Sequence, residues 1–265
     1  MLIAEVSAII KQVAAAEVLP RFRALATGEV MEKSPGDLVT IADQECERVL
    51  AGRLRELRDA PVVGEEATAA DPSLLDKITS APAAWIVDPI DGTSNFVAGN
   101  TDFAVMVALV EHGVTTHAWT WHPETDSLFA AKRGCGTTRN GVALADPPLS
   151  AEPRGILKRK YMDEPARSRL AELPDEVGAL VPAWGSAGIE YAALVEGKID
   201  FLMYWQTLPW DHAPGALLAQ EAGLHVARVD GSPYVPGDGR LGLLAAQPSL
   251  WPQLASLVQD ALTGI

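Results

Sequence analysis

The sequence of 265 residues predicts an α/β protein, with an α+β N-terminal half and an α/β C-terminal half. Apolar residues recur at helical spacing over residues 2–19, and a second helical pattern follows about twenty residues later. Short segments rich in β-branched and aromatic residues then occupy residues 61–131. Beyond Pro147-Pro148, strand and helix patterns alternate. We therefore expect two domains, residues 1–147 and residues 148–265.

The elements of the first half follow from periodicity and turn chemistry. The first helix spans residues 2–19, and Thr40-Ile41-Ala42-Asp43 reads as the capping box of a second helix. Asn140-Gly141 is a strong hairpin-turn signal near the end of this half. Between them, we expect strands at residues 61–63, 84–87, 103–110, 116–121 and 128–131.

The second half alternates between the two kinds of element. We expect strands at residues 155–160, 201–205 and 241–246. We expect helices at residues 165–173, 185–196 and 214–222, and a last helix from about residue 250.

Composition limits the partners and the compartment. The formal net charge of −14 disfavours direct binding to nucleic acid or to an anionic membrane, and no apolar stretch approaches the length of a membrane span. Cys46 and Cys135 are too far apart for metal-ligand spacing, which favours free thiols and a cytoplasmic location. Such an acidic chain suits an anionic substrate only if divalent cations lie between the two.

Acidic residues gather at the ends of predicted strands. Gly64-Glu65-Glu66, Asp88–Thr93 and Trp210-Asp211 each follow an apolar segment. Carboxylates that converge at one edge of a sheet repel one another unless cations neutralise them. Hard oxygen ligands favour Mg²⁺, with Mn²⁺ as a substitute, and the lack of a paired Cys/His cluster disfavours zinc.

The central segment combines two kinds of site. Pro89 restricts Asp88 to extended backbone, and Gly92 permits a tight turn. That turn presents the backbone N–H groups of Thr93 and Ser94, which is typical of an anion-binding nest. The sequence therefore predicts metal and phosphate binding within one short segment.

Four segments resemble, in order, those of the inositol monophosphatase family. They are Lys33–Thr40 with Asp43, Gly64-Glu65-Glu66, the run Trp85–Phe96 (WIVDPIDGTSNF) and Trp210–Gly215 (WDHAPG). The resemblance implies an αβαβα layered sandwich, two or three Mg²⁺ ions, inhibition by lithium and a homodimer. It also implies hydrolysis of a small phosphorylated metabolite by metal-activated water, without a covalent intermediate.

The resemblance also implies a role for each matching residue. Glu65, Asp88 and the carbonyl of Ile90 would hold one metal, and Asp88, Asp91 and Asp211 would hold another. Glu65, together with the hydroxyl of Thr93, would activate the attacking water.

The remaining implied roles concern phosphate, lid and substrate. The N–H groups of Gly92, Thr93 and Ser94 would bind phosphate, and the Thr93 hydroxyl would help to orient the water. Asp37 would support Thr93, and Lys33 would lie on a mobile loop that closes over the site. The substrate contacts would be Ser186 and Ala187, because Gly185–Gly188 matches the start of the family's substrate-side helix.

The sequence indicates the alcohol part of the substrate less directly than it indicates the reaction. Inositol 1-phosphate is the first expectation, but inositol-selective members carry a glutamate where this chain has Tyr204. Histidinol phosphate is the alternative substrate on the same core, ahead of 3′-phosphonucleotides and fructose 1,6-bisphosphate. The basic run Lys158-Arg159-Lys160 is interpreted as a solvated edge, or alternatively as a loop that reaches a substrate or partner.

Two other functions were considered. A haloacid-dehalogenase-type phosphatase is disfavoured, because its two aspartates lie two residues apart, whereas Asp88 and Asp91 lie three apart. The other is a regulatory protein with the phosphatase fold that binds proteins of transcription or ribosome assembly.

Overall fold

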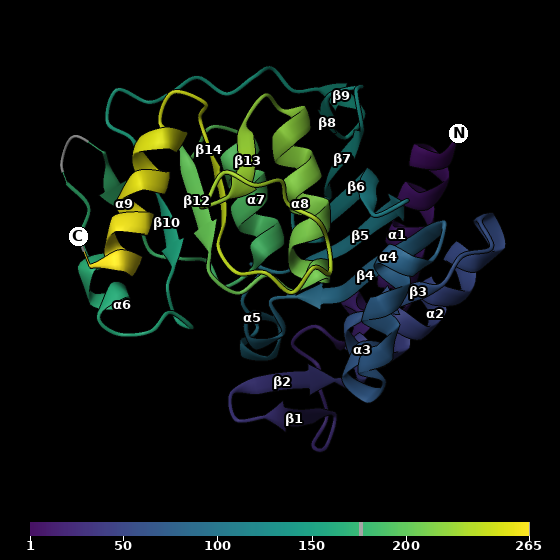
Figure 1. Cartoon of the computed structure of the whole chain (residues 1–265). Coiled ribbons are helices and arrows are strands. Elements are labelled where there is room, and N and C mark those ends of the chain that lie inside the picture. The colour runs from purple at the N-terminus through teal and green to yellow at the C-terminus, as the bar shows by residue number, and fades with distance from the viewer. Residues whose placement is uncertain (175–176, 265) are drawn as a thin grey trace.

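The computed structural model describes residues 1–174 and 177–264. Within these residues the chain forms five layers in the order helices, sheet, helices, sheet, helices (Figure 1). This confirms the predicted mixed α/β class and the αβαβα sandwich. No helix of the described residues is long and apolar enough to cross a bilayer.

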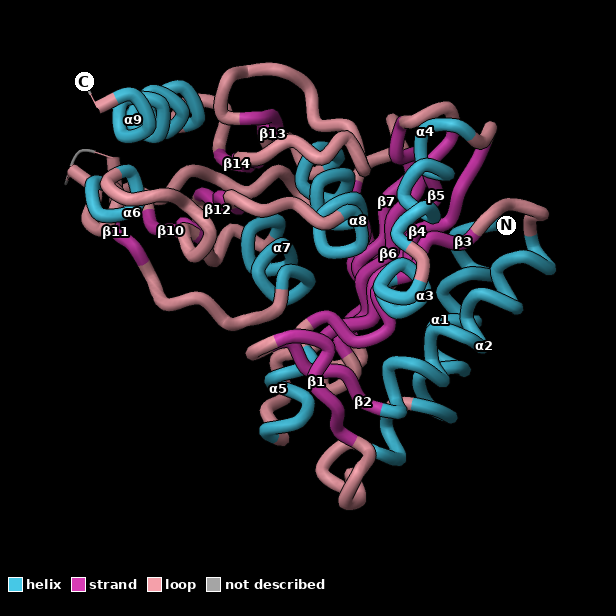
Figure 2. Tube along the Cα trace, turned by 60° about the horizontal axis from the view of Figure 1, so that its bottom comes forward, coloured by secondary structure: helices cyan, strands magenta, loops and turns pink. Residues whose placement is uncertain are grey.

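The first two layers come from the N-terminal half. Helices α1 (Leu2–Glu17) and α2 (Ile41–Leu57) pack side by side on one face of a seven-stranded sheet (Figure 2). The capping box that starts α2 is confirmed, since the Asp43 carboxylate accepts from the N–H of Thr40 at 2.8 Å. In sheet order, the strands are β3 (Val62–Gly64), β4 (Ala83–Asp91), β5 (Ala104–Glu111), β6 (Val114–His122), β7 (Ser127–Lys132), β8 (Thr137–Arg139) and β9 (Val142–Ala143).

The middle helices α7 (Ala187–Val195) and α8 (Pro209–Glu221) lie between the two sheets. The second sheet has the order β11 (Ala179–Leu180), β10 (Arg154–Lys158), β12 (Phe201–Tyr204), β14 (Leu243–Ala246) and β13 (His225–Arg228). Helices α6 (Ala166–Arg169) and α9 (Trp251–Thr263) form the outer layer. The last strand of the first sheet ends at residue 143, and the first strand of the second sheet begins at residue 154. The proposed domain boundary at 147/148 falls between the two sheets, and separate folding of the two parts stays a prediction.

Three small elements surround the edge where β3 and β4 end. Strands β1 (Val30–Ser34) and β2 (Asp37–Thr40) form a separate antiparallel hairpin below the main body (Figure 1). Helix α3 (Glu65–Ala70) follows β3, and helix α5 (Thr93–Ala98) follows β4. The short helix α4 (Lys77–Ser80) leads into β4.

Two expectations about local structure need correction. Lys33 was expected on a mobile loop, but it lies on strand β1. The helix expected over residues 165–173 is limited to Ala166–Arg169. The chain leaves the helical conformation at Leu170, whose φ and ψ are −93° and 14°.

The hairpin turn at Asn140-Gly141 is confirmed. Both residues have positive φ, 50° and 77°, which is the backbone conformation that a tight two-residue hairpin requires. The turn joins β8 to β9 at the far edge of the first sheet.

Candidate metal centre

The carboxyl end of β4 carries the central acidic segment into the interior. The pairing of β4 with β5 is regular up to Asp88 and irregular between Asp88 and Asp91. Pro89 lies in this irregularity and has no N–H to donate to the neighbouring strand. The interrupted ladder releases the Asp88 and Asp91 side chains from the regular alternation of a strand, although every residue of β4 is buried.

Three carboxylates meet where β4 ends and α8 begins. Asp88, Asp91 and Asp211 each offer an oxygen within 4.8 Å of those of the other two. Burial raises the pKa of Asp88 well above its usual range, and the charges of Glu65, Asp91 and Asp211 raise it further. One oxygen of Asp88, Oδ1, is buried without a hydrogen-bond partner. A divalent cation would neutralise this cluster and supply the missing partner, so the donor set fits Mg²⁺.

The N-terminus of α7 holds Asp91 in place. Ser186 Oγ donates to Asp91 Oδ2 at 2.5 Å, Gly188 N–H donates to the same oxygen at 2.6 Å, and Ala187 N–H donates to Oδ1 at 3.1 Å. Burial raises the pKa of Asp91 to about 6, although these three hydrogen bonds favour its charged form. A Cβ at Gly188 would lie 2.7 Å from the Cβ of Ala104, so only glycine allows this approach.

This contact changes the interpretation of the two expected substrate residues. Ser186 is 1% exposed and its hydroxyl donates to Asp91, so it positions a carboxylate. The Ala187 N–H makes the same connection. Their contact with substrate stays a prediction, while their contact with Asp91 links the second half of the chain to the first.

Glu65 and Glu66 share a lysine from the hairpin. Lys33 Nζ lies 2.6 Å from Glu65 Oε1 and 3.0 Å from Glu66 Oε1. Burial opposes the charge of Lys33, but the two carboxylates outweigh it and raise its pKa above the usual range. Glu65 lies outside the group of three aspartates, yet its charge raises the pKa of Asp88. The Lys33 side chain therefore provides positive charge beside the metal centre.

Helix α3 starts in a position that another buried carboxylate fixes. Glu47, on α2, accepts from the N–H of Glu66 at 2.7 Å and from that of Ala67 at 2.8 Å. A Cβ at Gly64 would lie 2.2 Å from the Glu47 carboxyl carbon, so glycine is required there. Glu47 thus sets the direction in which Glu65 leaves the strand.

The turn after Asp91 has the backbone conformation expected of a phosphate cradle, and phosphate binding there stays a prediction. Gly92 has a φ of 92°, and a Cβ there would lie 3.0 Å from the carbonyl oxygen of Asp102. The helix α5 begins at Thr93, and the N–H groups of a first helical turn have no partner within the helix. The N–H groups of Gly92, Thr93 and Ser94 are therefore available for phosphate, and the exposed Ser94 places this end toward solvent.

Support for Thr93 comes from a different aspartate than expected. Thr93 Oγ1 lies 3.2 Å from Asp43 Oδ1 and 3.1 Å from the carbonyl oxygen of Ile90. The expectation that Asp37 would support Thr93 is wrong, because Asp43 makes that contact, while Asp37 is exposed on β2 and lies 4.0 Å from Lys33 Nζ. Burial raises the pKa of Asp43 to about 6, while its hydrogen bonds to Thr40 oppose that rise.

Two carboxylates that support the site were not assigned to it from the sequence. Asp43 and Glu47 lie four residues apart on the face of α2 that also buries Cys46 and Leu50. Acidic residues at core-facing positions of an amphipathic helix are the signal that could have found them, because buried charge needs a partner.

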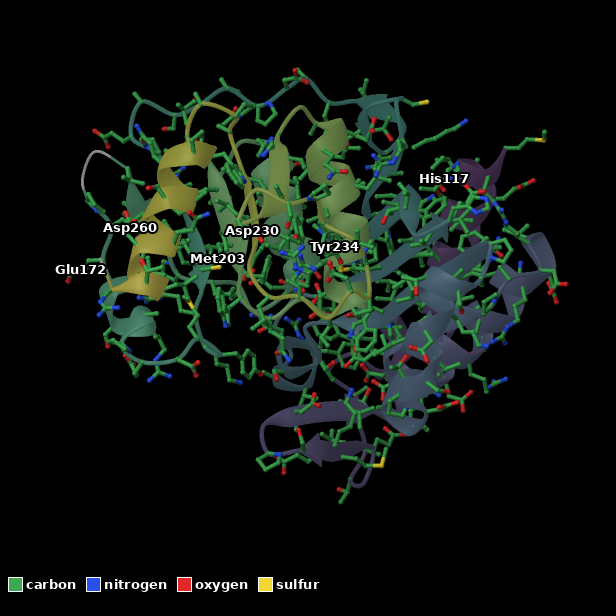
Figure 3. The ribbon with its side chains drawn as sticks, viewed as in Figure 1. His117, Glu172, Met203, Asp230, Tyr234 and Asp260 are labelled. Atoms are coloured by element: carbon green, nitrogen blue, oxygen red, sulfur yellow. The ribbon has the colours of Figure 1, made fainter. Side chains whose placement is uncertain are left out.

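We call the region around Tyr204 on β12 the leaving-group side, because the family resemblance leads us to expect the alcohol part of the substrate there. Its hydroxyl donates to Glu190 Oε2 at 2.5 Å, and its ring packs against His212 at a centroid distance of 4.3 Å. Strand alternation puts Tyr204 on the inner face, whereas Met203, labelled in Figure 3, packs in the outer cluster with α9.

Curated relatives match most of the chain. The chain is 30% identical to the inositol-1-monophosphatase of Bacillus subtilis over an alignment of 229 positions, which covers 83% of this chain and 82% of that protein. It is also 30% identical to the protein named Nus factor SuhB from Vibrio cholerae, over 74% of this chain and 73% of that protein.

The solved structures match the same architecture. An inositol monophosphatase (IMPase) from Thermotoga maritima superposes with a TM-score of 0.79 at 23% identity, covering 99% of this chain and 98% of that one. The sequence model of the inositol monophosphatase family matches residues 2–263 of this chain. Together with the buried acidic cluster, this match shows that the chain belongs to the inositol monophosphatase family of phosphomonoesterases.

Proposed function

We propose that the chain is a Mg²⁺-dependent phosphatase that releases phosphate from the monoester of a small polyol or amino alcohol. The observation that carries this proposal is the cluster of Asp88, Asp91 and Asp211, buried beside the cradle at Gly92–Ser94. An acidic, unneutralised cluster next to an anion-binding turn is suited to a substrate and cations that bind together.

Each group has a proposed part in the reaction. Asp88, Asp91 and Asp211 hold cations, with Glu65 and the carbonyl of Ile90 as further ligands. Bound Mg²⁺ would lower the pKa of a water and screen the negative charge of the ester.

The protein's own groups orient the reactants. The N–H groups of Gly92, Thr93 and Ser94 bind the phosphate oxygens. The Thr93 hydroxyl, held by Asp43, orients the water, and the Glu65 carboxylate accepts its proton. Asp43, rather than Asp37, therefore belongs to the proposed catalytic arrangement.

Inositol 1-phosphate is the first substrate to test, because relatives at about 30% identity carry inositol-1-monophosphatase as their name. Histidinol phosphate is the second. The experiment is phosphate release by the purified chain from a panel of polyol, amino-alcohol, sugar and nucleotide phosphates, with Mg²⁺, with Mn²⁺ and with EDTA. We expect turnover that needs the metal and that lithium inhibits. A chain that released no phosphate from any ester would contradict the proposal.

A regulatory role is the second candidate function. The likeness to a protein named as a Nus factor favours it, as does the acidic surface, which is compatible with a protein partner. The regulatory role would be preferred over the phosphatase function if the folded chain bound Mg²⁺ and yet hydrolysed none of these phosphate esters. We also propose a homodimer in the cytoplasm, which sedimentation velocity and cell fractionation would test.

A further inference from the structure

The polar groups on the leaving-group side of the site form one connected cluster. At its centre is Glu190, a fully buried residue of α7. Its Oε1 accepts from the N–H groups of Trp184 and Gly185 at 3.0 and 3.2 Å, and its Oε2 accepts from the Tyr204 hydroxyl at 2.5 Å. Burial removes the water that would otherwise bind this carboxylate, and these donors replace the lost hydrogen bonds.

This arrangement removes Tyr204 from recognition of the substrate. The Tyr204 side chain is 7% exposed, its hydroxyl is used by Glu190, and its ring lies between Tyr191 and His212. The position at which inositol-selective relatives present a carboxylate therefore presents no free polar group here.

The polar group that does reach the surface of this cluster is a lysine. Lys158 Nζ lies 2.9 Å from Glu190 Oε1, and the Lys158 side chain is 31% exposed. Lys158 is directly opposite Tyr204 in the parallel pairing of β10 with β12, so both side chains leave the same face of the sheet. An ammonium group has three N–H donors, and one contact with Glu190 leaves donors that can point to solvent.

Lys158 also borders the reacting centre. Both β10 and β12 end at this point, and the next element after β12 is α8, which carries Asp211 in its first turn. Glu190 binds the N–H of Gly185, whose carbonyl oxygen would lie 3.4 Å from a Cβ at Gly92. The carboxyl ends of strands are where α/β folds bind their ligands.

We propose that the Lys158 ammonium binds an anionic group on the alcohol part of the substrate, so that the preferred ester carries a second negative charge besides the phosphate that is cleaved. This inference rests on the proposed phosphatase function, and it replaces the neutral polyol or amino alcohol of that proposal by an alcohol that carries an anionic group. A carboxylate and a second phosphate offer the same anionic oxygens to the lysine. A neutral polyol phosphate such as inositol 1-phosphate is then the poorer substrate.

The test compares esters that differ in one charged group. In the first pair, 2-phosphoglycerate carries a carboxylate where glycerol 2-phosphate has a hydroxymethyl group. In the second pair, fructose 1,6-bisphosphate carries a second phosphate that fructose 1-phosphate lacks. We expect kcat/KM to be at least about tenfold higher for the doubly anionic member of one pair, with the difference mainly in KM. The pair that shows the preference identifies the anion.

A matched pair of variants assigns the preference to Lys158. In Lys158→Met the preference ratio should fall about tenfold, whereas in Lys160→Met, the same charge change two residues away at an exposed position, the ratio should not change. Because Lys158→Met leaves Glu190 without its cation, the double variant Lys158→Met/Glu190→Gln is measured as well, with its melting temperature. Raising the ionic strength should lower the ratio of the unmodified chain.

The outcomes separate the inference from the function on which it rests. Turnover of both neutral and doubly anionic esters at equal kcat/KM would overturn the inference and leave the phosphatase function standing. A preference that survives in the double variant would overturn it too. No turnover of any ester would overturn the phosphatase function itself.

Discussion

The metal centre and the leaving-group side of the same site are built in different ways. Two of the three carboxylates of the metal centre belong to one continuous segment, Asp88–Ser94, and Asp211 is added from α8. The leaving-group side joins Lys158, Glu190 and Tyr204 from three elements of the second half. A continuous segment keeps its internal geometry through its own backbone, whereas a side assembled from several elements can change one residue at a time. The reaction is therefore easier to identify than the alcohol.

The largest effect is expected from Asp88→Asn. The change removes a proposed shared ligand, so kcat/KM for phosphate release should fall at least about 10³-fold, as loss of preorganised charge stabilisation does. Because burial disfavours the Asp88 charge, the metal-free variant should melt no lower than the unmodified chain. Phosphate release and thermal melting in EDTA measure the two effects. Near-normal activity would remove Asp88 from the metal centre.

Removal of Mg²⁺ tests whether the stability of the metal centre depends on bound cations, as we do not expect for the leaving-group side. Mg²⁺ at a hundredfold excess over its Kd stabilises by about 2.7 kcal/mol, which is a rise in Tm of about 5–10 °C for a chain of this size. Glu66 and Asp91 supply the pH dependence, because burial raises their pKa to about 7 and about 6. The folded state keeps these protons above pH 4 while the unfolded chain releases them, so this contribution to metal-free stability falls as pH rises toward 7.

The Mg²⁺-induced rise in Tm should therefore be larger at pH 7.5 than at pH 5, since the ligands must lose their protons to bind the ion. Melting curves in EDTA and in Mg²⁺ at both pH values measure this. An equal rise at both would show that the ion binds elsewhere.

A smaller effect is expected at the support of Thr93, where two aspartates can be compared. Asp43→Asn weakens the group that lies 3.2 Å from the Thr93 hydroxyl and should reduce kcat about 10–100-fold, as loss of an outer-shell partner does. Asp37→Asn, at an exposed position on β2, is the control and should change kcat less than twofold. If Asp37→Asn had the larger effect, the assignment of Asp43 would be wrong.

The smallest effect on activity is expected from Tyr204→Phe, which tests whether Tyr204 on the leaving-group side contacts the substrate. The variant leaves Glu190 Oε2 without its donor, so the free energy of unfolding should fall by about 1–3 kcal/mol. KM should change little, because the hydroxyl points at Glu190 and away from solvent. Urea unfolding and steady-state kinetics measure the two quantities. A large rise in KM with unchanged stability would mean that Tyr204 contacts the substrate.

Much of the fold was predictable because local patterns act over short distances. The capping box at Thr40 and the positive-φ pair Asn140-Gly141 are decided by a few neighbouring residues, and both were found as predicted. The helix at residues 165–173 was overestimated, since its apolar spacing did not reveal where the helix would end. The hairpin that carries Lys33 gave no recognisable strand pattern, because both of its strands are short and β1 is mostly exposed.

By itself, the sequence determined the chemistry of the reacting centre. Its acidic segments, with Pro89 and Gly92 in the central one, specify ligand type and backbone geometry locally, and they identify the family. Only the tertiary structure decided that Asp43 supports Thr93 and that Ser186 holds Asp91. It also decided that Glu190 accepts a hydrogen bond from the Tyr204 hydroxyl and forms an ion pair with Lys158. These contacts join residues 14 to 95 positions apart. Which donor meets which acceptor over such separations depends on how strands and helices pack, and no local pattern records it.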